Sequence, residues 1–520
     1  MFLNVYTISA FVGLGGALFG FDIGSMSGVL STKQYEEFYG NPVGTLQGAI
    51  TGAMAAGSFI GALSSSFVAD KFSRKIAIQS GAVLWCIGAA IQASSNGVAM
   101  LAIGRVVGGL CIGVSSAIVP IYQAEIAPRR IRGRVVSFQV LAITCGTLIQ
   151  YFIQYGCSFI ESEAAFRVPW AIQAIPAVVL FFGLFWFPYS PRWLASQDRW
   201  DETLQVLAFL RSKFHDVNEP LVLAEFKEIE DQMREEREEQ TNPFQELLSQ
   251  KIRKRLFLTM AIQMWSQLSG MNVMMYYTRY VLAASGVANP KLASSVQYII
   301  NVVMTMPCVV WTDVWGRRSS VLVGAIMMSV WLFLIGGLLM RYGKPNADPN
   351  EPFTWQIVNH PAVSHTILAC TYLFVATFAI SWGPVSWIYP PEVIPLRVRA
   401  KGVSLATAAN WATNFALGLS VPPLFRSIRW ALFFLFGVFN VGAFFNVLFV
   451  MPETKQRTLE EMDEIFEHGD PLWKSFTIRG DANKLDKLAR DIELGVCRVQ
   501  TTINTELEDK QSRSKTNGHH

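Results

Sequence analysis

Twelve long apolar stretches limit how this chain can fold more than any other feature of its sequence. A helix needs about 20 apolar residues to cross the roughly 30 Å of hydrocarbon in a bilayer. The chain is therefore predicted to be an all-α membrane protein with twelve transmembrane helices. The predicted spans are Phe2 to Val29, Gly44 to Val68, Ile76 to Ala93, Val98 to Tyr122, Val135 to Gly156, Trp170 to Phe187, Leu256 to Ala283, Ala293 to Trp311, Val321 to Met340, Val363 to Tyr389, Gly402 to Leu424 and Trp430 to Met451.

Composition and charge placement agree with this prediction. Of the 520 residues, 51% are hydrophobic and only 16% are charged, which is too apolar for a soluble domain of ordinary composition. Most lysines and arginines fall in alternate connections between the spans, so those connections and both termini are predicted to be cytoplasmic. The net charge of +4 follows from this asymmetry and does not indicate a nucleic-acid partner.

A charged segment between the sixth and seventh spans divides the chain. It contains "EFKEIEDQMREEREEQ", which strongly favours helix and is far too polar for a membrane. The predicted domains are an N-terminal six-helix half at residues 1–190, a cytoplasmic helical linker at 191–255, a C-terminal six-helix half at 256–452 and a cytoplasmic tail at 453–520. Within the tail, "TLEEMDEIFEHG" predicts one short amphipathic helix before a disordered terminus.

The two halves are related by an internal repeat. "EIAPRRIRGR" (Glu125 to Arg134) matches "EVIPLRVRAK" (Glu392 to Lys401), and "DKFSRK" (Asp70 to Lys75) matches "DVWGRR" (Asp313 to Arg318). Each pair follows the same-numbered helix of its half, so the repeat is parallel and the halves are pseudo-symmetric. This topology is typical of transporters that bind substrate at the midplane between two halves.

The repeated loops mix acids with basic residues at matching places. Basic residues after a span can serve only as topology anchors, but the acids contribute nothing to orientation. We therefore expect ion pairs across the cytoplasmic mouth that form in the outward-facing state and break in the inward-facing state. The candidates are Asp70, Arg74, Glu125, Arg132, Asp313, Arg317, Glu392 and Arg399, with Glu453 after the last span.

Several longer motifs resemble one family. They are "GRVVGGLCIGVSSAIVPIYQAEIAPRRIRGR", "PYSPRWL", "QLSGMNVMMYY", "DVWGRR", "SWGPVSWIYPPEVIPLRVRAKG" and "PETKQRTLEE". In this order, from about Gly15 to Phe466, they are similar to the sugar porter family of the major facilitator superfamily, and in particular to its fungal members. The resemblance implies two six-helix halves that transport a sugar by alternating access.

Asp22 lies in the middle of the first apolar span. A charge there costs from ~3 kcal/mol upward, so an intramembrane carboxylate is expected to be functional and to have a partner. Arg105 lies inside the fourth predicted span and is the basic residue expected to be that partner, whereas Arg279 falls near the end of the seventh span. In proton-coupled members, the resemblance implies, the residue at Asp22 pairs with the residue at Arg105 and carries the proton. The alternative is that Asp22 faces a water-filled vestibule without that role.

A sugar site needs amides that donate and accept hydrogen bonds and an aromatic plane for the C–H face. The resemblance implies that Gln267, Asn272, Asn301, Trp387 and Asn410 contact the sugar, and that Tyr276 and Tyr277 close its outer side. "SGMN" and "SWGPVSW" are expected to interrupt the seventh and tenth helices, at bending points of an outer and an inner gate. Amides and tryptophans in membrane helices also serve as packing contacts, which is the alternative for each alone.

The sequence departs from the family at several places. Val140 stands where the usual sugar-binding glutamine is expected, and the adjacent Gln139, our remaining candidate on the fifth helix, is turned by about 100°. Ser266 replaces the first of two glutamines, and Tyr189 replaces a glutamate, so one cytoplasmic ion pair of the N-terminal half should be missing. "DKFSRK" also lacks the usual glycine and has Lys75 for arginine.

The sequence thus predicts a sugar:proton symporter that imports a hexose, pentose or small oligosaccharide. "GGALFG" (Gly15 to Gly20) resembles a pentose-associated pattern of fungal members. A passive sugar uniporter and a non-transporting sugar sensor remain alternatives. No nucleophile, base and orienting group converge in the sequence, so no enzyme is predicted, nor any metal or cofactor. We expect a monomer in the lipid bilayer of the plasma membrane.

Overall fold

The computed structural model describes most of the two predicted halves and of the linker. The described residues are 4–29, 32–40, 42, 45–128, 131–212, 215–238, 246–247, 249–277, 281–282, 285–286, 290–345 and 355–455, with Phe466 and Arg490. The helix predicted at "TLEEMDEIFEHG" lies outside the described residues, apart from Phe466.

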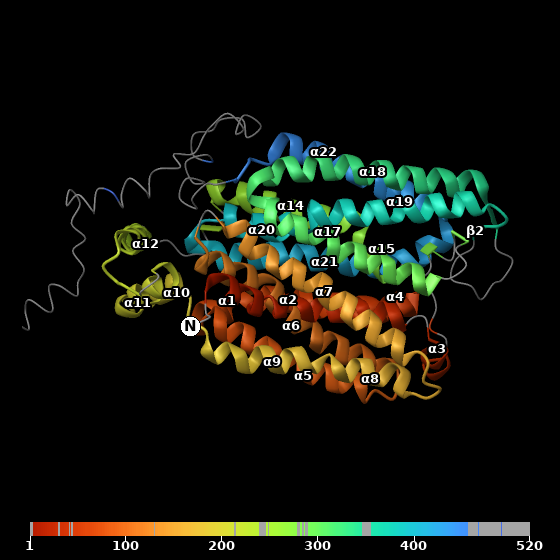
Figure 1. The fold of residues 1–520 in the computed structure, drawn as a ribbon, viewed down its shortest axis with the longest axis horizontal. Coiled ribbons are helices and arrows are strands. Elements are labelled where there is room, and N and C mark those ends of the chain that lie inside the picture. The colour runs from red at the N-terminus through yellow and green to blue at the C-terminus, as the bar shows by residue number, and fades with distance from the viewer. Residues whose placement is uncertain are drawn as a thin grey trace, which may run out of the picture. The chain divides into compact units, whose positions relative to one another are not determined.

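The N-terminal half is a bundle of helices (Figure 1). Most apolar spans fold as one continuous helix, whereas the first and the sixth are each divided into consecutive helical pieces. The elements are α1 (Val5–Val12), α2 (Leu14–Val29), α3 (Lys33–Phe38), α4 (Thr45–Phe72), α5 (Arg74–Ala93), α6 (Val98–Ile126), α7 (Arg132–Cys157), α8 (Ala164–Ile172), α9 (Ala174–Gly183) and η2 (Leu184–Trp186).

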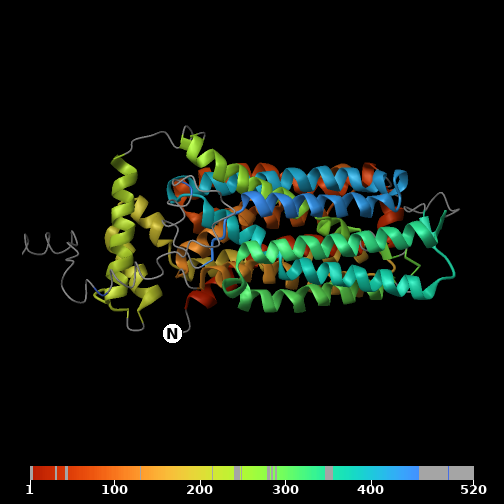
Figure 2. The same ribbon diagram turned by 90° about the horizontal axis from the view of Figure 1, so that it is seen from above.

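The C-terminal half follows the same plan and adds a small β-hairpin between α18 and α19. Its elements are α14 (Gln250–Leu268), α15 (Met271–Tyr276), α17 (Pro290–Trp315), α18 (Arg317–Tyr342), β1 (Gly343–Pro345), β2 (Trp355–Ile357), α19 (Pro361–Ile380), α20 (Trp382–Val393), η3 (Leu396–Val398), α21 (Arg399–Ser427) and α22 (Ala431–Val450). Strands β1 and β2 pair antiparallel. The long helices of both halves run side by side (Figure 1, Figure 2), with α21 packed on α4 and α17 on α7.

Pro188–Asn242 belong to a compact unit of their own. The predicted linker at 191–255 extends further, into α14, which begins at Gln250. The described helices of the unit are α10 (Pro191–Ser196), α11 (Trp200–Arg211) and α12 (Pro220–Glu238), as its charged sequence predicts. Arg211 and Glu225 join α11 to α12 through an ion pair of 2.6 Å. Tyr189, which replaces the family's glutamate, stacks on Trp193 and lies under the guanidinium of Arg199.

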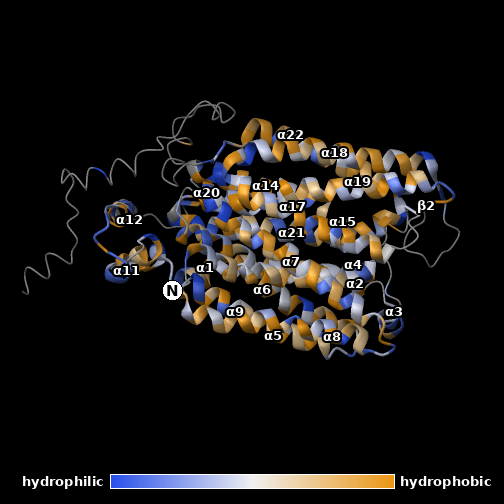
Figure 3. Ribbon diagram, viewed as in Figure 1, coloured by the Kyte–Doolittle hydropathy of each residue, from blue (hydrophilic) through white to orange (hydrophobic). Residues whose placement is uncertain are grey.

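The twelve predicted spans are present as helices. In the described part of the chain, ten segments are long and apolar enough to cross a membrane, and α14–α15 and α21 supply the other two. Apolar residues predominate along the outer helices. Hydrophilic residues gather at the end of the bundle that carries the α20 label (Figure 3). Side chains such as Trp186, Phe182 and Val438 are largely exposed, as expected where lipid replaces water.

Both predicted helix interruptions are confirmed. Helix α14 ends at Leu268, and Gly270 adopts a left-handed conformation with φ +91° before α15 begins at Met271. In the tenth span, Ser381 leaves the helical region at ψ −85° between α19 and α20. Backbone groups freed at such breaks are tolerated in a membrane only inside the protein or along a cavity.

Glycines at every fourth position bring α2 against α7. A Cβ added at Gly16, Gly20, Gly24 or Gly28 would collide with atoms of α7 between Gln139 and Gln154. Helices in membranes associate through such small residues because backbones can then approach closely. Two glycines of "GGALFG" thus have a packing role, which the sequence alone does not separate from a role in sugar choice.

The repeated loop after the second helix of each half shows a difference in backbone strain. Gly316 has φ +90° and ψ 152°, a conformation that only glycine adopts without strain. Ser73 occupies the matching place at φ +117° and ψ 160°, and its hydroxyl accepts a bond from the Ile76 amide. Such strain costs on the order of 1–3 kcal/mol.

We expect Ser73→Gly to raise the free energy of unfolding by about 1 kcal/mol, because relief of strain exceeds the small loss from exchanging a serine cap for glycine. Gly316→Ser is the mirror control: it adds the strain and brings Cβ within 2.7 Å of Glu453 Oε2, so stability should fall. Thermal unfolding of the purified protein followed by tryptophan fluorescence checks both. A Ser73→Gly protein no more stable than the parent would contradict the strain.

Candidate functional site

Asp22 and Arg105 form a buried ion pair inside the N-terminal half. Arg105 Nη1 lies 2.9 Å from Asp22 Oδ1, and Nη2 lies 3.2 Å from Oδ2, so the contact is bidentate. Both side chains have no solvent exposure. Arg105 also donates to the carbonyl oxygens of Ile50 and Thr51 on α4, at 2.8 and 3.3 Å. The structure therefore joins α2, α6 and α4 through one guanidinium.

Amide side chains of α14, α15 and α21 form a hydrogen-bonded chain within the C-terminal half. Gln263 donates to the Ser386 carbonyl and accepts from Asn410 at 2.6 Å. Asn410 accepts from Gln267 at 3.0 Å, and the Gln267 oxygen accepts from both Asn272 and Asn414. We call Gln263, Gln267, Asn272, Asn410 and Asn414 the amide chain. Gln267 has the most hydrogen-bond partners of the five.

The amide chain borders a small cavity of about 10 Å³, which is room for a single water. It is lined by Thr51, Asn272, Val273, Tyr276, Tyr277, Asn414, Leu417 and Gly418. Tyr277 donates to the Gly418 carbonyl at 3.2 Å, which closes one wall. A sugar needs far more volume, so the structure is closed to a sugar at this place.

One residue connects the cavity with the ion pair. Thr51 contributes its carbonyl oxygen to Arg105 and also lines the cavity beside Tyr276. The buried charges and the space between the halves are therefore neighbours through α4.

The structure brings some of the predicted sugar-site residues together and separates others. Gln267, Asn272 and Asn410 belong to the amide chain, and Tyr276 and Tyr277 line the cavity. Asn301 and Trp387 are buried but are not among the residues that line it. Gln139 packs on Gly16 of α2, and its Oε1 has no hydrogen-bond partner.

Three residues of the site were missed from the sequence. Gln263 and Asn414 each stand four positions from a predicted residue, Gln267 and Asn410, and so share its helix face. That spacing was the available signal. Thr51 gave none, because its contribution to the ion pair is a backbone carbonyl.

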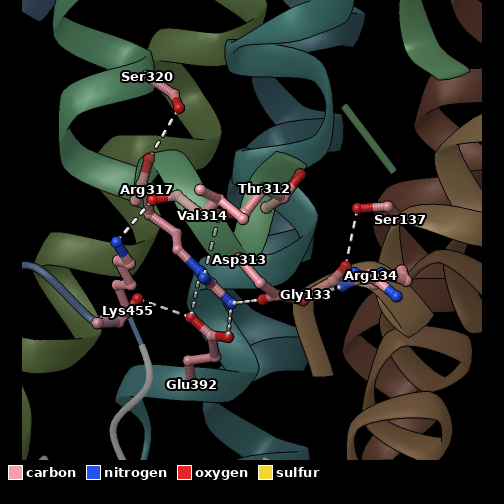
Figure 4. A network of polar contacts seen from close by, with 12 residues as sticks. Gly133, Arg134, Ser137, Thr312, Asp313, Val314, Arg317, Ser320, Glu392 and Lys455 are labelled. Atoms are coloured by element: carbon pink, nitrogen blue, oxygen red, sulfur yellow. Dashed lines mark hydrogen bonds and ion pairs between the residues drawn. The ribbon is translucent and has the colours of Figure 1, made fainter. Parts of the chain in front are cut away.

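At the opposite end from α15, the C-terminal half holds a dense polar network (Figure 4). Arg317 lies 2.7 Å from Glu392 and 2.9 Å from Asp313. The Glu453 carboxylate accepts from the backbone amides of Arg317 and Arg318, at the N-terminus of α18. A carboxylate at this position satisfies amides that have no partner within the helix and complements the helix dipole.

The N-terminal half has the matching pairs. Arg74 lies 3.2 Å from Glu125 and 3.4 Å from Asp70. Arg132 and Arg399 begin α7 and α21 at equivalent places, and both are buried. Arg74 and Arg317 therefore meet acids singled out from the repeat, and each of these ion pairs lies within one half.

One contact that joins the two halves at this end of the bundle involves a backbone amide. The backbone amide of Arg134, in the first turn of α7, donates to Asp313 Oδ2 at 2.9 Å. Gly133 lies so close to Asp313 and Arg317 that an added Cβ would collide with both side chains (Figure 4). Here a carboxylate of one half meets a helix N-terminus of the other. The predicted ion pairs between the halves stay a prediction.

We expect Gly133→Ala to separate the halves at this mouth and to slow transport severalfold, because the new methyl group meets the Asp313–Arg317 pair. Gly156→Ala, on the same helix but with open space around it, should leave transport unchanged. Initial uptake rates, normalised to surface protein, compare the two. Equal rates for both variants would show that the mouth does not need the close contact.

The fold and this arrangement define a membrane transporter with two related six-helix halves. Residues 8–466 match the model of the family described as sugar (and other) transporter. The MFS glucose transporter mfs1 of Aspergillus flavus is 51% identical over 496 residues, covering 93% of this chain and 94% of that protein. The high-affinity glucose transporter of Kluyveromyces lactis is 40% identical, covering 91% and 87%.

The fold is similar to that of a solved structure. The proton:xylose symporter XylE of E. coli is 24% identical, with a TM-score of 0.76 over 89% of this chain and 99% of that chain. The chain belongs to the sugar porter family of the major facilitator superfamily. It is a multi-pass sugar transporter, and its family and relatives are transporters rather than enzymes.

Proposed function

We propose that the chain is a sugar:proton symporter that imports a hexose by alternating access, with Asp22 as the residue that carries the proton. The relatives named as glucose transporters favour a hexose, and the similar fold of a proton:xylose symporter accords with coupling. The observation that carries the proposal is the fully buried, bidentate contact between Asp22 and Arg105.

The contacts of Arg105 suit a carboxylate that gains and loses a proton. When Asp22 is protonated, its attraction for the guanidinium weakens, and Arg105 still donates to the Ile50 and Thr51 carbonyls. The buried cation then keeps partners in both protonation states, which limits the cost of the step. Because Thr51 also lines the cavity, a shift of Arg105 reaches the sugar site through α4.

Sugar recognition is assigned to the amide chain together with Tyr276 and Tyr277. Each amide has a donor and an acceptor, as a hydroxyl group requires. In the closed form the amides bond to one another, so a sugar binds by exchanging those bonds for its own. Asn301 and Trp387 are proposed to reach the sugar only when the halves move apart.

The proposal also includes the orientation and the gate. The ion-pair network of Arg74 and Arg317 and the Arg134–Asp313 contact form the cytoplasmic mouth, which opens to release sugar. Both termini are then cytoplasmic, and the protein acts as a monomer in the plasma membrane. The alternatives are a passive uniporter and a sugar sensor without transport.

We expect Asp22→Asn to abolish accumulation of sugar against its gradient, because the amide cannot carry a proton. Labelled glucose uptake into transporter-null cells at pH 5 and pH 7.5, with and without a protonophore, measures this. Parent uptake should rise in acid and collapse with the protonophore. The variant should only equilibrate sugar, while exchange of labelled for unlabelled sugar persists and shows that it is folded.

Glu163→Gln is the matched control for this experiment, since Glu163 is an acid of the same half whose pair with Arg167 is exposed. It should accumulate sugar as the parent does. Saturable parent uptake that is indifferent to pH and protonophore would make the protein a uniporter. Correctly localised protein that takes up none of glucose, xylose, galactose, lactose, cellobiose or glycerol would favour the sensor.

A second experiment tests the sugar site. Gln267→Ala removes the amide with the most partners in the chain and should raise KM about tenfold or more, since hydrogen bonds at a site built for hydroxyls discriminate strongly. Gln139→Ala removes an amide that packs on Gly16 and should leave KM near the parent value. The KM of both variants is measured from uptake kinetics. A larger rise of KM in Gln139→Ala than in Gln267→Ala would place the sugar site nearer α7.

A further inference from the structure

Tyr298 makes contacts to both halves from a buried position on α17. Its hydroxyl lies 2.6 Å from Ser27 Oγ on α2 and 3.0 Å from the Met275 carbonyl oxygen on α15. Its ring packs on Tyr151 of α7, with ring centroids 4.7 Å apart. The residue is 1% exposed. One side chain of the C-terminal half thus holds α15 and touches two helices of the N-terminal half.

These contacts lie at the end of the bundle opposite the polar network of Arg317. Helix α7 begins near that network, where the Arg134 amide meets Asp313, and runs away from it to Cys157. Tyr151 is in its last turns, and Ser27 is near the end of α2 at Val29. In the proposed orientation this is the outer end.

The neighbouring Gln297 strengthens the hold on α15. Its amide donates to the Met274 carbonyl at 3.1 Å, next to the carbonyl bound by Tyr298. Helix α15 has only six residues, and the last four carbonyls of any helix lack partners within it. Side chains of α17 therefore supply partners for this segment, whose Tyr276 and Tyr277 line the cavity.

We propose that Tyr298 is a positioning residue that closes the outer side of the site by joining α15 to α2 through its hydroxyl. The inference rests on the proposed alternating access. Opening toward the outside separates α2 from α15 and α17, and so must break the Tyr298–Ser27 contact. Ser27 lies on the helix that carries Asp22, so the closed position of α15 is tied directly to the helix of the proton site.

The hydroxyl can be removed without the ring. Tyr298→Phe keeps the packing on Tyr151 and loses the bonds to Ser27 and Met275. A net intramolecular hydrogen bond shifts an equilibrium by about tenfold or less, so a change of about three- to tenfold toward the outward-open form is expected. The matched control is Tyr372→Phe, which removes a tyrosine bond from α19 to the Ala293 carbonyl of α17, inside one half.

Accessibility from outside is the primary measurement, and it requires neither transport nor coupling. Leu417→Cys, in the cavity wall, is introduced into the parent and both tyrosine variants, and its labelling by a membrane-impermeant thiol reagent is timed in intact cells. Labelling of protein without the added cysteine is subtracted. The rate should rise about three- to tenfold with Tyr298→Phe and stay unchanged with Tyr372→Phe. Equal rates in all three proteins overturn the proposal.

Uptake kinetics give a second readout that a loss of folded protein would not reproduce. A larger outward-open fraction lowers the apparent KM for external sugar, because more carriers are competent to bind, and lowers kcat, because closure is harder. Both should fall severalfold in Tyr298→Phe. Ser27→Ala should give the same change, and combining the two substitutions should not enlarge it. An unchanged KM contradicts the inference. Parent uptake indifferent to a protonophore would instead count against proton coupling.

Discussion

A carboxylate and a guanidinium that have both lost all contact with water impose the main constraint on the N-terminal half. Removing two charges from water is very costly unless they meet with good geometry and their remaining donors are satisfied. Asp22 and Arg105 meet these conditions because their contact is bidentate and because α4 presents two carbonyls to the guanidinium. The position of three helices is therefore linked to the charge state of one group, which is the physical basis of the proposed coupling.

The sequence was sufficient for the architecture because its signals are local. The spans, the charged linker and the breaks at Gly270 and Ser381 follow from hydropathy and backbone chemistry. Asp22 and Arg105 could be paired because a membrane interior leaves a charge few partners. The contact of Asp313 with the Arg134 amide could not be predicted, since every residue except proline has a backbone N–H. Thr51 was missed for the same reason, and Tyr298 because its role depends on which helices become neighbours.

The two halves of the molecule share a plan but differ in detail at the end that holds the polar network of Arg317. The C-terminal half uses Gly316 in a conformation suited to glycine and closes it with Glu453. The N-terminal half has a strained Ser73 at the matching place, and Lys75 donates to carbonyls at the end of its last helix. Tyr189 makes aromatic contacts in the linker unit where the family pattern has an acid. The N-termini of α18 and α5 are therefore capped differently, by Glu453 and by Ser73.

The amide chain has a consequence for the part of the cycle in which no sugar is carried. A symporter must return its empty site to the outside after each delivery. Amides exposed in an empty site would hold water, and that water would have to be stripped or carried along during the return. Here Gln263, Gln267, Asn272, Asn410 and Asn414 hydrogen-bond to one another, and Asn272 and Asn414 line a space for a single water. In the proposed cycle, the unloaded carrier closes with its amides already bonded to one another, so fewer bonds to water have to be broken on the return.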